Sequence, residues 1–396
     1  MPQNIGLCLE QKLRFVLAAL EQAACLAQLC RTWRLSRQTG YKWLRRYRAG
    51  GVAALQERSR APHRCPHALS QLWVQRIESL RRRHPSWGPK KLRAALKRQY
   101  PRSRWPASST IGTCLQHLGL LIPRRRRLRG PVVKARPARV AMKPNDVWTV
   151  DFKGWFTTAD GQRVDPLTVR DLASRYGLLA KMLSGQKFPP VQEAFIGLFR
   201  RHGQPLAIRM DNGSPFGSAG PAGLSRLSAW FVSLGIEVQF SRRGHPEDNG
   251  SHEQWHRVLK AETTRPPASD HSRQAARTTR WLRHYNQVRP HEALDQKTPA
   301  RHYRNSRRPY RGCQPPSYPP HLLKRWVNHS GEIKWQGRFR FVGEAFAKRY
   351  VVLKPQRQGL WRVFYYHVFL GELHDADLSG LRPAIHHHPS KGPRKV

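Results

Sequence analysis

Acidic residues are scarce in this chain. Its 396 residues include 24 Asp and Glu against 72 Lys and Arg, which gives a formal net charge of +48. Self-repulsion on this scale destabilises a compact chain unless a polyanion screens the charge. The composition therefore favours nucleic acid as the partner, with an acidic membrane surface as the second choice, and it does not fit an ordinary solvated surface.

Long apolar runs and a cysteine framework are also missing. No stretch of 18 apolar residues occurs, and the N-terminus has no basic-then-apolar signal pattern. We therefore expect no membrane partner and a cytoplasmic, nucleoid-associated protein. The six cysteines form no Cys-x-x-Cys pair, which predicts reduced, structural thiols. Hydrophobic residues make up 39% of the chain, enough for folded cores, and the length suggests two or three domains.

Residues 8–52 have the pattern of a helix-turn-helix domain. Ser36 is a good helix N-cap, and Gly50 and Gly51 end the helix that follows it. One stripe of this helix is apolar and the opposite stripe is polar and basic, as in a helix that enters the DNA major groove. A small helical packing module is the alternative. The predicted DNA contacts on the polar stripe are Arg37, Gln38, Tyr41, Lys42 and Arg45.

Residues 66–122 predict a second helix-turn-helix domain. Its last helix is opened by Pro106 and has Ile111 and Leu115 on an apolar face, which leaves Ser109 and Thr113 to face DNA. The segment 123–143 has no apolar period and many prolines and arginines. We expect it to be a basic linker along DNA phosphates. Its predicted contacts are Arg124, Arg125, Arg126 and Arg127.

From residue 144 to 301 the pattern changes to α/β. The predicted order is three strands, a helix, a strand, a helix, a strand and further helices, which fits a mixed sheet with helices on both faces. Residues 302–320 are rich in Pro, Arg and Tyr and read as a second linker. Residues 321–380 contain short strands separated by glycine turns and predict a small β-barrel.

Three acids of the α/β segment are placed where a catalytic metal site would need them. Asp151 sits inside a strand, where an acid is unfavourable, and Asp211 directly follows a strand. Glu253 lies in the first turn of a helix and shares a face with His256 and Lys260. An acid that faces DNA weakens binding unless it holds a cation, and Mg²⁺ prefers carboxylate oxygens. Glu253 also fits a second interpretation, an acid that stabilises a helix N-terminus.

Four motifs occur in a fixed order: "VDFKG", "MDNGSPF", "HPEDNGSHEQWHRVLK" and "YNQVRPHEAL". Together they resemble the DDE integrase-core transposases of bacterial insertion sequences. The resemblance implies a ribonuclease H-like core with the triad Asp151, Asp211 and Glu253. The second spacing, 253 − 211 = 42, is longer than is usual for the family, and we assign the excess to the glycine-rich segment 217–225. Glu247, at 247 − 211 = 36, remains a rival third acid.

The resemblance also implies a reaction and its partners. Two Mg²⁺ or Mn²⁺ ions would be held by the triad for 3′-end cleavage of terminal inverted repeats and for strand transfer into target DNA. Asn249, His256 and Lys260 would contact DNA. Joining two ends implies a homo-oligomer, at least a dimer, and no small-molecule substrate. The "YNQVRPH" motif could serve either a structural turn or DNA contact.

Three other functions remain open at this point. The chain could be a catalytically inactive DNA-binding regulator derived from such a transposase. It could be a nuclease that cuts without joining. An RNA-packaging or ribosomal protein would fit the charge, but it would leave the three spaced acids unexplained.

Overall fold

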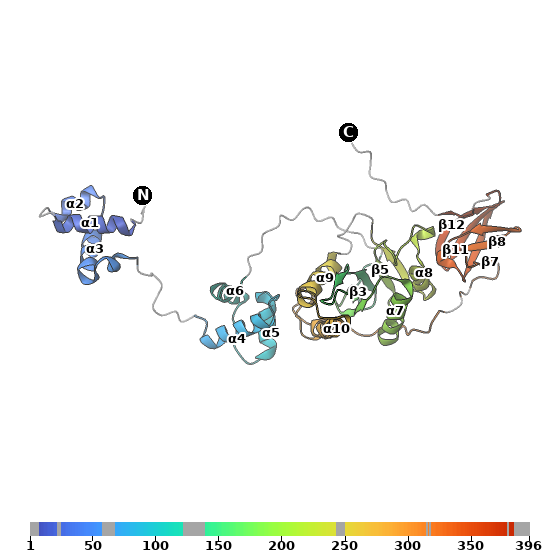
Figure 1. Ribbon diagram of the computed structural model, residues 1–396, viewed down its shortest axis with the longest axis horizontal. Coiled ribbons are helices and arrows are strands. Elements are labelled where there is room, and N and C mark those ends of the chain that lie inside the picture. The colour runs from blue at the N-terminus through green and yellow to red at the C-terminus, as the bar shows by residue number, and fades with distance from the viewer. Residues whose placement is uncertain are drawn as a thin grey trace, which may run out of the picture. The chain divides into compact units, whose positions relative to one another are not determined.

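The computed structural model describes residues 8–21, 25–57, 68–121, 139–242, 250–313, 316, 318–377 and 380–383. The chain divides into two compact units, residues 1–68 and 69–396 (Figure 1). No helix in these described ranges has the length and apolar character needed to cross a bilayer.

The N-terminal unit is a helical domain built around Phe15. Its elements are α1 (Leu9–Glu21), α2 (Leu26–Thr32), α3 (Arg37–Gly50) and the short η1 (Val52–Leu55). Ser36 caps α3 as predicted, because its Oγ accepts a hydrogen bond from Thr39 N. Gly40 allows α3 to pack closely, since a Cβ there would lie 2.7 Å from Cys30 Sγ.

A second set of three helices opens the larger unit. It consists of α4 (Gln71–Arg83), α5 (Pro89–Gln99) and α6 (Ser108–His117). Their shared core contains Ile77, Leu92, Leu96, Ile111 and Leu115, all of which are nearly or fully buried. The apolar face predicted for α6 therefore packs against α4 and α5.

A six-stranded mixed sheet forms the centre of the larger unit. Its strands are β1 (Val147–Phe152), β2 (Phe156–Thr157), β3 (Arg163–Asp171), β4 (Gly177–Leu183), β5 (Ala207–Met210) and β6 (Glu237–Phe240). The order is β2-β3-β1-β5-β6, and β4 also pairs with β3. β1, β5 and β6 are parallel, whereas β3 is antiparallel to β1 and to β4. This arrangement agrees with the ribonuclease H-like core predicted from the motifs.

Helices cover both faces of this sheet. The helices are α7 (Phe188–His202), α8 (Arg226–Ser233), α9 (Gly250–Thr263), α10 (His271–Gln287), η2 (Pro221–Gly223), η4 (Glu292–Leu294) and α11 (Pro299–His302). α7 and α8 share a core with Trp148 and Val150. α9 and α10 instead pack Trp255 and Trp281 around Ala180 of β4. The face opposite Trp148 and Val150 is therefore the one that α9 covers.

The C-terminal region is rich in strands. It contains β7 (Leu323–Trp326), β8 (Glu332–Trp335), β9 (Arg338–Phe341), η5 (Glu344–Phe346), β10 (Tyr350–Arg357), β11 (Leu360–Tyr365), β12 (Val368–His374) and β13 (Arg382–Pro383). Five strands form a sheet in the order β13-β12-β11-β10-β7, and β8 pairs with β9. A bridge between Val327 and Ile333 joins this hairpin to the end of β7, and Leu381 N donates to Phe341 O on its other side.

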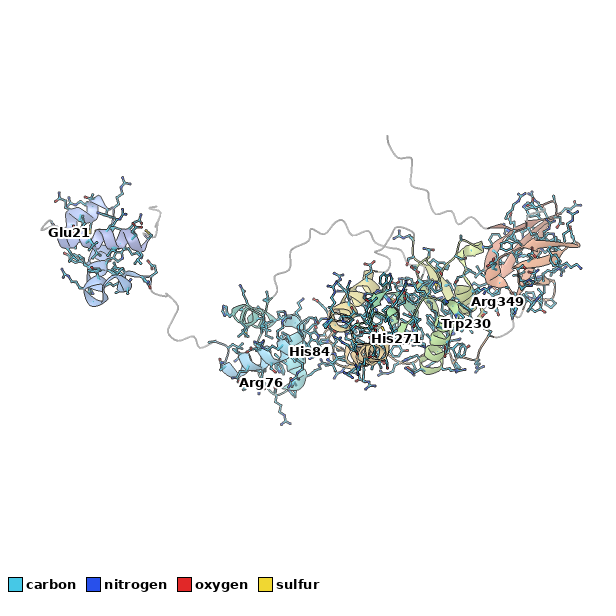
Figure 2. All side chains as sticks on the ribbon, viewed as in Figure 1. Glu21, Arg76, His84, Trp230, His271 and Arg349 are labelled. Atoms are coloured by element: carbon cyan, nitrogen blue, oxygen red, sulfur yellow. The ribbon has the colours of Figure 1, made fainter. Side chains whose placement is uncertain are left out.

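α8 belongs to two hydrophobic cores at once. Leu227 and Trp230 pack in the core of the central sheet, and Figure 2 marks Trp230. Ala229 and Val232 pack in the core of the C-terminal strands, together with Leu224 from the loop before the helix. Residues 227–233 are consequently all buried.

Part of the segment expected as a linker, 302–320, packs on the core. Tyr303 is 6% exposed and stacks on Tyr176 at a centroid distance of 4.3 Å. The Arg308 guanidinium donates hydrogen bonds to the carbonyls of Pro205 and Gly235. The aromatic and basic residues of this segment thus have buried partners, which composition alone did not reveal.

Candidate active site

Asp151, near the end of β1, and Asp211, directly after β5, occupy matching positions on two adjacent strands. β1 and β5 are parallel, and Thr149 pairs with Arg209. Continuing this register by two residues places Asp211 opposite Asp151, because 209 − 149 and 211 − 151 both equal 60. Neighbouring strands lie about 4.8 Å apart, and residues opposite each other point to the same face. The spacing of 60 therefore brings both carboxylates to one edge of the sheet.

The turn after β5 holds Asp211 in place. The Gly213 backbone N–H donates to the Asp211 carboxylate. Asn212 Nδ2 donates to the Ser241 carbonyl after β6 at 2.6 Å. A Cβ on Gly217 would lie 2.6 Å from the Asn212 carbonyl oxygen, so this turn needs a glycine there. The amide and glycines of "DNGSPFG" thus serve to fix the acid at the strand end.

Two histidines, His252 fully buried and His256 largely so, hold α9 against the sheet beside Asp151. His252 Nδ1 lies 2.7 Å from Thr149 Oγ1. Thr168 Oγ1 lies 2.7 Å from both His252 Nε2 and His256 Nε2, and it donates to the Asp151 carbonyl. Because a hydroxyl has one hydrogen and two lone pairs, this pattern makes both Nε2 atoms donors. His256 Nδ1 then carries a lone pair, and it lies 3.8 Å from Asp151 Oδ2.

Glu253 follows His252 in the first turn of α9. Its side chain is exposed, whereas its neighbours His252 and Trp255 are buried against the sheet. The anchored helix therefore carries Glu253 to the side of the sheet where Asp151 lies. The Glu253 charge adds to burial and to the Asp211 charge in raising the pKa of the Asp151 carboxyl.

Asp211 and Glu253 influence the Asp151 carboxyl electrostatically. Burial raises the pKa of Asp151 to about 7, with further contributions from the charges of Asp211 and Glu253 and opposition from a Phe152 backbone hydrogen bond. Partial burial also raises the pKa of Asp211, although much of that residue is solvent-accessible. Burial, Lys153 and Arg170 lower the pKa of His256 to about 3, so this imidazole is neutral at pH 7. A cation near the three carboxylates would relieve their repulsion.

The donor set suits a hard divalent cation. Asp151, Asp211 and Glu253 offer carboxylate oxygens, which Mg²⁺ and Mn²⁺ prefer. Among the residues that the structure describes, no three Asp, Glu, His or Cys side chains are already gathered closely enough to hold an ion. Electrostatic influence reaches farther than coordination, which explains how Asp211 and Glu253 can affect Asp151 without forming a closed cage.

Three cations, Lys153, Lys260 and Arg265, lie close enough to one another for their charges to interact. Burial lowers the pKa of the Lys153 ammonium, and the nearby charges of Lys260 and Arg265 lower it further. Lys153 follows Asp151 by two residues, and Lys260 is exposed on α9. Cations that repel one another next to carboxylates suit a site that receives a polyanion.

Models of known families match most of the chain. The integrase core domain matches residues 141–246 and 234–299. A homeodomain-like domain matches residues 39–115, and a helix-turn-helix domain matches residues 11–63. The C-terminal domain of the IS481 family transposases matches residues 324–378. The predicted DNA-binding, catalytic and C-terminal regions each have a counterpart.

Curated relatives come from insertion elements. An uncharacterized 39.2 kDa protein of insertion element IS476 from Xanthomonas euvesicatoria is 26% identical over 61% of this chain and 67% of its own length. An uncharacterized 31.7 kDa protein of IS407 from Burkholderia multivorans is 25% identical over 59% and 82%. Transposase InsD of Escherichia coli is 26% identical over 56% and 74%.

This chain belongs to the DDE-type integrase-core transposases of bacterial insertion sequences.

Solved integrases are also similar to this transposase. The HTLV-2 integrase catalytic core domain in complex with magnesium is 17% identical, covering 41% of this chain and 99% of its own, with a TM-score of 0.32. A simian T-cell lymphotropic virus intasome chain is 16% identical, covering 70% and 97%, with a TM-score of 0.35.

The structure leaves the predicted DNA-facing residues of both helical domains open to solvent. On α3 of the transposase, the exposed residues are Arg37, Gln38, Tyr41, Lys42 and Arg45. On α6, Ser109 and Thr113 are exposed. His256 differs from these, because its side chain is only 12% exposed and points to the sheet.

Other sequence predictions lie outside the described residues. These are the basic-linker arginines Arg124, Arg125, Arg126 and Arg127, the predicted DNA contact Asn249, and the rival acid Glu247. Their contribution to the transposase stays a prediction.

The sequence interpretation missed the residues that support the predicted triad. Thr149, Thr168 and His252 do not carry the expected chemistry of the site, but they hold α9 against it. Arg170, which donates to Ser251 Oγ and lies over Trp255, is buried beneath the same helix. The spacing of His252, Trp255 and Leu259 along one helix face was the available signal, since it predicts a histidine packed inward.

The "YNQVRPH" motif has structural partners within the transposase. The Asn286 side-chain amide pairs with both the N–H and the carbonyl of Gly177 at 2.8 Å. Arg289 Nη1 donates to Glu262 Oε1 at 2.6 Å. The glycine-rich segment 217–225 also has structural partners, because Leu224 packs with the C-terminal strands. Its extra length contributes to the contact with that region.

Proposed function

We propose that this transposase binds the terminal inverted repeats of its insertion sequence and catalyses metal-dependent 3′-end cleavage and strand transfer into target DNA. The observation that carries the proposal is the shared register of Asp151 and Asp211, with Glu253 on the helix that covers the same face. A chain of charge +48 is suited to bind a polyanion, and three acids close to the bound phosphates would weaken that binding unless divalent cations bridge the two.

Asp151, Asp211 and Glu253 would hold two Mg²⁺ or Mn²⁺ ions. When bound, such ions activate the attacking oxygen, first of water and then of the freed 3′-hydroxyl, and stabilise the leaving oxygen of the scissile phosphate. The protein supplies orientation: Gly213 fixes the Asp211 carboxylate, and Thr168 fixes the Asp151 backbone. No protein nucleophile is needed for this reaction.

The chain's own cations would position the DNA strand. Lys153, Lys260 and Arg265 lie close enough for their charges to interact, and they would bind phosphates that flank the scissile bond. Neutral His256 would keep α9 seated through Thr168 and present a lone pair toward Asp151. His256 would thus support the site from within the protein, whereas Lys260 would contact the DNA strand.

Binding to the transposon ends would come from the two helical domains. α3 would enter the major groove with Arg37, Gln38, Tyr41, Lys42 and Arg45, and α6 would do so with Ser109 and Thr113. The linker arginines 124–127 and Asn249 would add phosphate contacts. Pairing two ends would require a homo-oligomer on DNA, acting at the bacterial nucleoid.

A cleavage assay tests this proposal. Duplexes that carry the sequences flanking the reading frame are incubated with the protein and MgCl₂ or MnCl₂, and both nicked and joined strands are resolved. We expect Asp151→Asn and Asp211→Asn each to lower cleavage by at least about a thousandfold while end binding stays unchanged. Lys42→Ala is the contrasting variant, since it should weaken end binding and leave the chemistry of bound DNA intact.

If the wild-type protein still cleaved DNA after divalent ions were removed by a chelator, the proposed chemistry would be wrong. End binding without any cleavage would instead support the inactive regulator, and nicked products without joined strands would support a nuclease. The assay therefore separates the three functions.

A further inference from the structure

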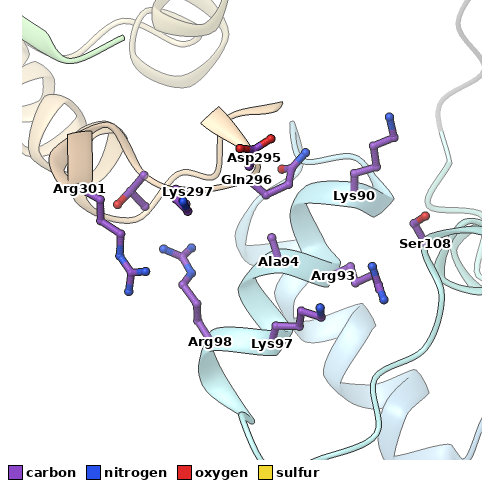
Figure 3. Close-up of a pocket in the computed structure, with 11 residues that line it drawn as sticks. Lys90, Arg93, Ala94, Lys97, Arg98, Ser108, Asp295, Gln296, Lys297 and Arg301 are labelled. Carbon is purple, nitrogen blue, oxygen red and sulfur yellow. The ribbon is translucent and has the colours of Figure 1, made fainter. Parts of the chain in front are cut away.

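A cationic cavity lies between the second helical domain and the end of the catalytic core. Its volume is about 500 Å³, and its walls are α5 and the segment 295–301 (Figure 3). Six cations and one acid, Asp295, line it, a balance of 6 − 1 = +5. The cations are Lys90, Arg93, Lys97, Arg98, Lys297 and Arg301.

Contacts between the second helical domain and the core flank this cavity. Lys90 Nζ lies 2.5 Å from Glu292 Oε1, and Arg98 Nη2 donates to the Val288 carbonyl at 2.6 Å. Nearby, His84 and His284 stack with ring centroids 5.1 Å apart. The cations of both walls are therefore held around one space.

Several of these charges are not neutralised within the described part of the protein. No ion pair or side-chain hydrogen bond forms at Lys297 or Arg301 among the described residues, and Lys97 lies over the Trp105 ring. Figure 3 shows Arg98 extending from α5 toward Arg301. Burial lowers the pKa of Arg98, and the charge of Arg301 lowers it further. Cations that converge in this way favour an anion between them.

The position of the cavity indicates which anion. Ser108, the first residue of α6, lines it, and Ala107 has no side-chain acceptor to cap the helix. An uncapped helix N-terminus adds backbone donors for a phosphate. In a helix-turn-helix domain whose second helix reads the major groove, the neighbouring helix and the turn lie along the sugar-phosphate backbone.

We propose that this cavity binds the phosphate backbone of a DNA duplex held by α6, so that the second helical domain and residues 297–301 of the core grip the same strand. The inference rests on the proposed function, since it assumes DNA as substrate. The grip fixes the orientation of the core on the bound end. Inorganic phosphate carries the same chemistry, and the experiment distinguishes it from DNA.

A matched pair of double variants tests the cavity. Lys297→Ala with Arg301→Ala removes two cavity charges, and Arg200→Ala with Arg201→Ala removes two exposed charges of α7 outside the cavity. Binding to a duplex of the flanking sequence is measured without divalent metal across a salt series, with far-UV circular dichroism and Tm as folding checks. The charge-conserving variant Lys297→Arg with Arg301→Lys is the rescue.

We expect the cavity variant to lose affinity on the order of tenfold and its salt slope to fall by about 1.8, the value for two phosphate contacts. The α7 variant should retain wild-type affinity and slope, and the rescue variant should recover most of the binding. Wild-type binding by the cavity variant, or an equal loss in the α7 variant, would overturn the inference.

Inorganic phosphate forms the second arm. Millimolar phosphate that raises the Tm of the wild type but not of the cavity variant, with DNA affinity equal in both, would assign the cavity to a small anion and overturn the DNA site. These binding and Tm measurements need no catalysis, so they can contradict the cavity site without contradicting the proposed function. The proposed function would instead be contradicted if the wild type bound the DNA but left it uncut in MgCl₂.

Discussion

At the scale of single residues, Asp151 combines burial with two nearby negative charges. Its side chain is 22% exposed, and its pKa is raised to about 7. A carboxyl group whose pKa is raised by folding binds more protons in the folded than in the unfolded state between its two pKa values. The stability of the metal-free protein therefore falls as pH rises from about 4 through about 7.

Asp151→Asn should stabilise the metal-free protein at pH 8. The difference between a pKa of about 7 and the ordinary 3.8 corresponds to at most about 4 kcal/mol of unfolding free energy, which the wild type loses when Asp151 ionises. The variant avoids this loss because its amide is neutral. We expect a higher Tm for the variant at pH 8 and a difference that shrinks toward pH 4, measured by thermal unfolding in EDTA.

Divalent metal provides the complement to that measurement. At pH 8, MgCl₂ or MnCl₂ should raise the Tm of the wild type by mass action and raise that of Asp151→Asn much less. A variant that is less stable than the wild type at pH 8 in EDTA would show that Asp151 is not under electrostatic strain.

At the scale of elements, α9 depends on polar contacts to the sheet. The register of 60 residues between β1 and β5 brought Asp151 and Asp211 together, and that spacing was visible in the sequence because strand patterns flank both acids. The set of polar contacts that holds α9 against the sheet was not visible in the sequence. It depends on Thr149 and Thr168 from two strands that meet His252 only after the sheet has formed.

Removing one hydroxyl tests whether these polar contacts hold α9 in place. Thr168→Val keeps the shape of the side chain but leaves two buried imidazole N–H groups without their acceptor, which should cost about 1–3 kcal/mol of unfolding free energy. Since α9 carries Glu253, cleavage should fall as well, by roughly tenfold or more. Urea unfolding and the cleavage assay measure the two effects.

Thr157→Val is the control, because Thr157 is exposed on β2. It should change neither stability nor cleavage. If Thr168→Val behaved like this control, the histidine contacts would not be what holds α9.

At the scale of the whole molecule, one partly buried acid connects the second helical domain to the core. Glu262 of α9 accepts from Ser86 Oγ, Trp281 Nε1 and Arg289 Nη1. Arg289 is 5% exposed and Glu262 23% exposed. Burial tends to raise the pKa of Glu262, but Arg289 and these hydrogen bonds outweigh it and lower the pKa. This contribution to stability is present above the ordinary Glu pKa and is lost as pH falls below it.

Glu262→Ala should destabilise the larger unit by about 3–5 kcal/mol, because it leaves the Arg289 guanidinium buried without its ion-pair partner. Limited proteolysis should then cut more rapidly between the second helical domain and the core. Glu292→Ala is the matched control, since the Lys90–Glu292 pair is 66% and 70% exposed and should contribute little. Equal protease sensitivity of the two variants would contradict a special role for Glu262.

The double burial of α8 limits how this chain can be divided. Cutting the chain near residue 320 would leave Ala229 and Val232 facing water on a helix that has no polar side to offer in exchange. A catalytic fragment without the C-terminal strands would therefore expose an apolar surface on α8 and self-associate. The catalytic core and the C-terminal strands should therefore be expressed together, as a single folding unit.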